Sequence, residues 1–158
     1  MNSNYLCLFL SSTANAVAGC NGTWGNMEAM WGHPLAKIVL VLMGGGLGSL
    51  SRYRITLLSV KLFGIRFPWG TLIVNLTGCF LIGLSFALAE RSSLMNSSVR
   101  LFFVTGFLGG LTTFSTYGYE TFNAIYIGNQ WTAIGNVFFN NVAGLILVFL
   151  GFRLGGIP

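Results

Sequence analysis

Ionisable side chains are scarce in this sequence. Its 158 residues include eight Lys or Arg, three Asp or Glu and one His, and no aspartate occurs at all. About 25–35% of the surface residues of a soluble protein are charged, whereas charged residues make up only 7% of this chain. So few charges cannot cover a water-facing surface of ordinary composition, and the sequence therefore predicts a membrane protein.

Cysteine and histidine are too rare and too scattered to indicate a metal or redox site. Cys7, Cys20 and Cys79 lie far apart, without the C-x-x-C spacing of such sites. The sequence suggests neither a Ser-His-Asp set nor a paired-carboxylate site, so we expect no enzymatic activity. The basic residues occur singly rather than in runs, and we expect no nucleic-acid partner.

Apolar residues dominate instead, at 54% of the chain. A hydrocarbon core about 30 Å thick needs roughly 20 apolar residues per helix, which leaves room for about four spans. Pro34 and Pro68 stand where two of the long apolar runs begin, and proline is well tolerated in the first turn of a helix. We predict an all-α membrane protein with four transmembrane helices, at residues 35–59, 69–89, 99–127 and 131–154.

Residues 1–33 differ from the rest, being rich in Asn, Ser, Gly and Trp. They lack the basic start of a signal peptide, although residues 17–20 faintly resemble a lipoprotein cleavage site. We interpret them as an N-terminal extension that is either disordered or due to a start codon assigned too early, with Met27 or Met30 as the first residue. The transmembrane domain is then expected at residues 34–158.

The third predicted span contains a run that disfavours a helix. Gly109-Gly110 is followed closely by Thr112-Thr113, and Gly and Thr are both poor helix formers. Backbone groups left unpaired in a bilayer are costly, so a break is retained only where it lines a cavity or binds an ion. We predict that the third helix is broken at its centre; the alternative is that the glycines only permit close helix packing.

Positive charges are balanced between the two sides of the predicted topology. One side carries Lys37, Arg91, Arg100 and Arg153, and the other carries Arg52, Arg54, Lys61 and Arg66. The positive-inside rule then gives almost no preferred direction of insertion. Insertion in both orientations, and with it an antiparallel homodimer, is therefore permitted.

Several polar side chains are expected at membrane depth. They are Arg52, Asn75, Thr77, Thr112, Thr113, Ser115, Thr116, Asn136, Asn140 and Asn141. Such groups can replace the water shell of an anion, although interhelical hydrogen bonding explains any single one equally well. Arg52 is either intramembrane or lies just beyond a first span that ends near Leu50. Glu120 is either a buried partner of an arginine or an interfacial residue.

Three segments together resemble the CrcB/Fluc family of fluoride channels. They are residues 44–53 (GGGLGSLSRY), 70–78 (GTLIVNLTG) and 109–120 (GGLTTFSTYGYE), which occur in the family's order and spacing. The resemblance implies an antiparallel, dual-topology homodimer with two fluoride pores. It also implies a structural Na⁺ at the dimer interface, held here by the backbone carbonyls of Gly109 and Thr112.

The resemblance also assigns an anion pathway. Thr113, Ser115 and Asn75 are expected to be hydrogen-bonding groups beside it, Phe114 to offer its ring edge to fluoride, and Arg52 to attract anions. Thr71, Tyr117, Asn136 and Asn140 complete the expected pathway.

The chain departs from the family pattern at some of these positions. Tyr117 stands where the family usually has a second Phe, and its hydroxyl is expected to add a donor or to narrow the pore. Asn136 and Asn140, four residues apart and so on one helix face, stand where Tyr and Ser are usual. Because amides can also donate to an anion, we expect function to be kept.

The resemblance implies a fluoride-specific channel in the cell membrane that exports fluoride passively and lowers its cytoplasmic concentration. The nearest alternative is a small proton-coupled transporter of the multidrug type, which also has four spans. Such exporters need a carboxylate in the first span, and residues 35–59 contain none. A membrane scaffold without transport activity is a third alternative.

Overall fold

The computed structural model describes residues 34–91 and 95–156, so the predicted N-terminal extension lies outside the described residues. The chain divides into two units, Met1–Val39 and Leu40–Pro158. Of the first unit, the described residues are 34–39, which are helical. All the contacts discussed below belong to the second unit.

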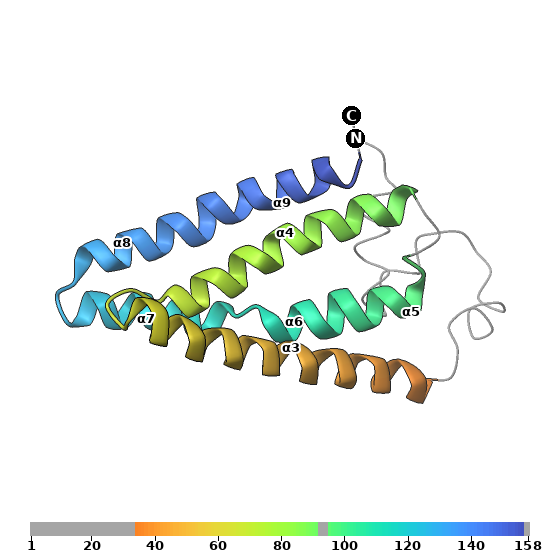
Figure 1. The fold of residues 1–158 in the computed structure, drawn as a ribbon, viewed down its shortest axis with the longest axis horizontal. Helices are drawn as coiled ribbons and strands as arrows, with labels where there is room; N and C mark the ends of the chain where they lie inside the picture. Colours follow the sequence, from red (N-terminus) through yellow and green to blue (C-terminus); the bar gives the residue numbers. More distant parts are fainter. Residues whose placement is uncertain (1–33, 92–94, 157–158) are drawn as a thin grey trace. The chain divides into compact units, whose positions relative to one another are not determined.

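Regular structure in the described ranges is entirely helical (Figure 1). The elements are α3 (Pro34–Phe63), α4 (Trp69–Arg91), α5 (Ser97–Arg100), η3 (Leu101–Leu108), α6 (Gly109–Leu111), α7 (Phe114–Tyr126), α8 (Gln130–Phe138), η4 (Phe139–Ala143) and α9 (Gly144–Leu154). Four stretches are long and apolar enough to cross a membrane: Pro34–Phe63, Trp69–Glu90, Ser97–Tyr126 and Gln130–Leu154. The prediction of four apolar, membrane-length helices is confirmed.

The helix boundaries follow local chemistry. α3 continues past Leu50 and ends before Gly64, whose φ of 76° is readily adopted only by glycine. The helix thus continues beyond Leu50, and Arg52 lies inside α3. Pro68 directly precedes α4, and Gly128, with φ of 79°, forms the turn between α7 and α8.

The second and fourth spans pack along each other, as the α4 and α9 ribbons in Figure 1 show. Glycines make this approach possible on both sides. A Cβ at Gly83 would overlap the Val148 carbonyl, and one at Gly151 would overlap the Phe80 carbonyl. Small residues that bring two backbones close are typical of helix pairs in membranes.

Two segments, η3 and η4, have π-helical turns, in the third and fourth spans respectively. A π-helical turn changes the register of the side chains that follow it, and such turns occur often at functional sites. η3 leads directly into α6, and η4 separates α8 from α9. Both irregular segments therefore lie within apolar spans, where an ordinary α-helix would be expected.

The buried apolar cluster is small and lies close to α6. Val74, Leu108 and Leu111 are its buried members, with Phe103 and Phe107 among the partly buried side chains packed against it. Large apolar side chains are exposed along all four spans. Such a surface is unsuited to water and suited to lipid or to a partner helix.

Candidate functional site

Two residues with extended backbone, Thr112 and Thr113, separate α6 from α7. Thr112 has φ −83° and ψ 158°, and Thr113 has φ −152° and ψ 118°. The Thr112 N–H and Oγ1 both donate to the Leu108 carbonyl, each at 3.0 Å. Thr113 Oγ1 accepts from the Thr116 N–H at 3.3 Å and so caps α7. The helical backbone is thus interrupted at Thr112 and Thr113, inside a stretch of membrane length.

The side chain of Asn75, on α4, replaces the backbone partners that Thr113 lacks. Asn75 Oδ1 accepts from the Thr113 N–H at 2.9 Å, and Asn75 Nδ2 donates to the Thr113 carbonyl at 3.2 Å. One primary amide thereby satisfies both polar backbone groups of one extended residue, much as a neighbouring β-strand would. The interruption therefore has its hydrogen bonds satisfied at Thr113 without water.

The carbonyl groups beside the interruption face other partners. Arg52 Nη1 donates to the Thr112 carbonyl at 3.2 Å, which brings a guanidinium group from α3 to the end of α6. In a continuous helix the Thr113 N–H would bond to the Gly109 carbonyl, but here it points to Asn75. The Gly109 oxygen consequently loses its helical donor.

Hydroxyl groups and an exposed ring gather at the start of α7. Thr113 Oγ1 donates to Thr116 Oγ1 at 3.0 Å and lies 3.5 Å from Ser115 Oγ. The Phe114 side chain is 82% exposed. Because the amide groups at a helix N-terminus carry partial positive charge, this end of α7 favours an anion.

A line of amides runs from the interruption along the fourth span. Asn75 Nδ2 donates to Asn140 Oδ1 at 2.9 Å, and Asn140 Nδ2 donates to Asn136 Oδ1 at 2.9 Å. Asn136, which is fully buried, donates to Thr121 Oγ1 at 2.9 Å. Thr121 in turn donates to the Tyr117 carbonyl at 2.8 Å, so each group along the line is held in a fixed orientation.

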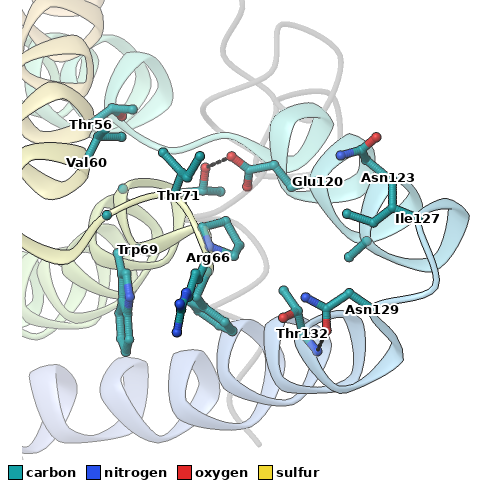
Figure 2. A pocket seen from close by; sticks show the side chains of 16 residues that line it. Thr56, Val60, Arg66, Trp69, Thr71, Glu120, Asn123, Ile127, Asn129 and Thr132 are labelled. Carbon is teal, nitrogen blue, oxygen red and sulfur yellow. Dashed lines mark hydrogen bonds between the residues drawn. The ribbon is translucent and has the colours of Figure 1, made fainter.

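A pocket of about 270 Å³ opens at one end of the spans, between the α3–α4 loop and the α7–α8 turn (Figure 2). Inside it, Thr71 Oγ1 donates to Glu120 Oε1 at 2.8 Å, the pair joined by a dashed line in Figure 2. Glu120 Oε2 is buried and has no hydrogen-bond partner in the described part of the chain. Within the described part of the chain, Glu120 is therefore bonded to Thr71 and not to an arginine. The interpretation of Glu120 as the partner of an arginine is wrong for this part of the chain.

The residues predicted from the sequence fall into connected groups. Arg52, Asn75 and Thr113 meet at the interruption, where Ser115 joins the hydroxyl cluster, and Asn136 and Asn140 continue from Asn75. Tyr117 lies beside Phe114, with ring centroids 5.5 Å apart. Thr71 is separate, at the pocket.

Three residues outside the predicted pathway bond to residues within it: Thr121, Glu120 and Asn141. Thr121 follows Tyr117 by one helical turn, a spacing that places both on one face of α7 and could have indicated its role. Asn141 directly follows Asn140 but bonds to Tyr117 on α7, whereas Asn140 bonds to Asn75 on α4, and the sequence pattern gives no signal for that partner.

The arrangement suits a small anion better than any covalent chemistry. It combines a helix N-terminus, hydroxyl donors, amide donors, a guanidinium group and exposed ring edges within one set of apolar spans. Aromatic ring edges carry partial positive charge, and hydroxyl and amide donors can replace part of a hydration shell. The site thus offers positive potential and hydrogen-bond donors where lipid offers neither.

Replacing Asn75 with Ala should disturb the interruption specifically. The Thr113 N–H loses its acceptor, so its amide hydrogen exchange should accelerate at least tenfold, and the chain should lose roughly 2–4 kcal/mol of stability. Exchange measured by mass spectrometry on the purified protein checks this. The control is Asn123→Ala, which removes an exposed amide side chain from α7, the helix that begins after Thr113. This variant should leave the exchange of the Thr113 amide unchanged. Equal exchange in both variants would contradict the role given to Asn75.

The sequence that forms this site matches a known protein family. The family model described as "CrcB-like protein, Camphor Resistance (CrcB)" matches residues 39–152, a range that includes the interruption, the amide line and the pocket.

Individual relatives align with this chain along nearly their whole length. The fluoride-specific ion channel FluC of Dehalococcoides mccartyi is 42% identical over 123 residues, which cover 78% of this chain and 95% of that protein. The FluC of Chloroflexus aurantiacus is 44% identical over 119 residues, covering 75% and 94%. The FluC of Clostridium perfringens is 41% identical over 126 residues, covering 78% and 98%. The resemblance is confirmed: the chain is a multi-pass membrane protein that belongs to the CrcB family.

Proposed function

We propose that this chain forms a fluoride-specific channel in the cell membrane, through which fluoride leaves passively and its cytoplasmic concentration falls. The observation that carries the proposal is the interruption at Thr112 and Thr113, with the exposed Phe114 ring and a cluster of hydroxyls beside it. Irregular backbone within a membrane is tolerated where it lines a cavity or binds an ion. The relatives that are 41–44% identical to this chain are named fluoride-specific ion channels.

Fluoride makes particular demands on such a path. It is small and strongly hydrated, so the protein must offer donors in place of water. The hydroxyls of Thr113 and Ser115 and the ring edge of Phe114 are suited to do so, and all lie at or beside the N-terminus of α7. Arg52 extends from α3 to the end of α6, where its guanidinium group adds a full positive charge close to the same point.

Polar groups continue from the interruption toward the pocket. Thr71 precedes Asn75 by one turn on α4, so the two lie on one face of that helix. Glu120, bonded to Thr71, lies in the pocket at the end of the spans. We therefore place the mouth of the path at the pocket and its narrow part beside Phe114, with Asn136 and Asn140 forming part of its wall.

The channel is proposed to be an antiparallel, dual-topology homodimer. Phe114, Ser115 and Thr116 are exposed on the single chain, and hydroxyls facing lipid are disfavoured because the bilayer core offers them no partner. A second copy would cover this surface and enclose the path. The four positive charges expected on each side allow both orientations of the chain.

We also propose that a structural Na⁺ is held at the dimer interface by the Gly109 and Thr112 carbonyls of both copies. These groups fit the role, because carbonyl oxygens are suitable ligands for a hard cation. The Gly109 oxygen has lost its helical donor to Asn75, and the Thr112 oxygen already accepts from a cationic group. A bound Na⁺ would supply fixed positive charge beside the anion path.

Arg52 shares the Thr112 carbonyl in this proposal. That oxygen has two lone pairs, so it can accept from Arg52 and still face a cation. Two positive charges so close together repel each other, and an anion between or beside them offsets the repulsion. The arrangement therefore stabilises bound fluoride more than it would stabilise an empty path.

The proton-coupled multidrug transporter is not favoured. Its exchange chemistry needs an ionisable carboxylate in the first span, and α3 contains neither Asp nor Glu.

Fluoride efflux tests the proposal directly. Liposomes reconstituted with the natural protein should release fluoride rapidly, at a rate that an imposed proton gradient does not change. Phe114→Ile removes the exposed ring edge, and Asn75→Ala loosens the interruption, so each should slow efflux at least tenfold. Phe122→Ile, at another exposed ring of α7, is the matched control and should retain efflux. Strict dependence on a proton gradient, or no efflux at all, would remove the channel assignment.

Dual topology can be tested by labelling from one side of the membrane. In a cysteine-free background, Ile127→Cys and Ser98→Cys lie near opposite ends of the third span and are both exposed. An impermeant maleimide applied from outside the cell should label about half of the molecules of each variant. Complete labelling of one variant and none of the other would contradict insertion in both orientations.

The proposed cation predicts a dependence of stability on Na⁺. Because a ligand that binds only the folded protein stabilises it, replacing Na⁺ with N-methylglucamine should lower the thermal unfolding temperature of the detergent-solubilised protein. Restoring Na⁺ should reverse the change, whereas the same concentration of choline should not. An unfolding temperature that does not depend on the cation counts against the sodium site and leaves the channel proposal standing.

A further inference from the structure

The side chain of Asn141 holds the hydroxyl group of Tyr117. Asn141 Nδ2 lies 3.0 Å from Tyr117 Oη and 2.7 Å from the Val137 carbonyl, and it donates to both. A primary amide nitrogen carries two hydrogens, so these two bonds use its full donor capacity. The Tyr117 oxygen is therefore an acceptor in this pair, and its own hydrogen is directed elsewhere.

The phenolic hydrogen of Tyr117 has no acceptor among the described residues. A phenol has one hydrogen to donate and can accept through its oxygen at the same time. Tyr117 is only partly buried, and Asn141 is exposed. The pair thus presents a hydrogen-bond donor at the surface of the single chain, with its oxygen fixed in position by an amide.

Asn141 reaches Tyr117 from the π-helical segment η4. Asn140 and Asn141 are consecutive, yet Asn140 bonds to Asn75 and Asn136 while Asn141 bonds across to α7. In an α-helix consecutive side chains diverge by about 100°. The two amides accordingly face different neighbours, Asn140 facing α4 and Asn141 facing α7.

The donor lies beside the ring that the proposed channel uses. The Tyr117 and Phe114 rings are 5.5 Å apart between centroids and tilted by 58°. Both residues belong to the first turns of α7, whose N-terminus favours negative charge. An anion that passes the ring edge of Phe114 therefore passes close to the Tyr117 side chain.

We infer that the Tyr117 hydroxyl, positioned by Asn141, donates a hydrogen bond to the permeating fluoride and strengthens its selection over larger halides. This inference rests on the proposed channel function and adds a specificity-determining pair to it. Electrostatic attraction to a donor falls with distance, so the smaller fluoride gains more from a fixed O–H group than chloride does. Asn141 acts as a positioning residue, because it touches the hydroxyl and not the anion.

The test measures fluoride efflux from liposomes over a range of fluoride concentrations, using the full chain. Tyr117→Phe should raise the half-saturating fluoride concentration about tenfold, as expected for losing a hydrogen bond to a charged group, while most of the maximal rate is kept. Asn141→Ala should raise it about threefold, because the hydroxyl remains but loses its orientation. The double variant should match Tyr117→Phe alone, since the two residues act through one group.

Tyr126→Phe is the matched control. Tyr126 is on the same helix, is 80% exposed, and its hydroxyl has no hydrogen-bond partner among the described residues. The half-saturating fluoride concentration of this variant should therefore equal that of the natural protein. Thermal unfolding of all variants should be within a few degrees of the natural protein.

The outcomes are distinguishable. A channel that conducts normally and whose half-saturating concentration is unchanged in Tyr117→Phe overturns the inference alone. A lower maximal rate at constant half-saturation assigns Tyr117 a structural role and likewise overturns it. Additive effects in the double variant would overturn the role of Asn141. A natural protein that passes no fluoride removes the proposed function and this inference with it.

Discussion

The pairing of one amide side chain with one extended residue is the constraint on which the rest of the site depends. Asn75 bonds both polar backbone groups of Thr113, and water is not available in a bilayer core to do the same. Without that pairing, the free backbone groups would favour a continuous helix, and α7 would not begin where it does. The orientation of Phe114, the hydroxyl cluster and the helix N-terminus all follow from the start of α7.

The side chain of Asn75 also connects three spans through hydrogen bonds. Asn75 comes from the second span, Thr113 from the third and Asn140 from the fourth, while Arg52 reaches the neighbouring Thr112 carbonyl from the first. Each of these bonds crosses between helices in an apolar setting, where a bond that is lost leaves a group without a partner. The polar residues of this protein thus help to fix the arrangement of its helices.

The helices could be predicted from the sequence because the length of each apolar run decides where a span lies, and few charged residues interrupt these runs. The Gly109-Gly110 and Thr112-Thr113 run also lies where the two extended residues are found. The partners of the polar groups could not be predicted in the same way. Thr121 and Asn141 depend on how helices turn toward one another, and the π-helical turn of η4 breaks the periodicity from which faces are inferred.

The close glycine contact between α4 and α9 has a consequence for biogenesis. These two helices are separated in sequence by the whole third span, so their contact can form only after the last segment has left the ribosome and entered the bilayer. Until then Asn140 is absent, and Asn75 can bond Thr113 but has no further partner. A nascent chain of three spans therefore holds only part of this hydrogen-bonded network, and the arrival of the fourth span completes it.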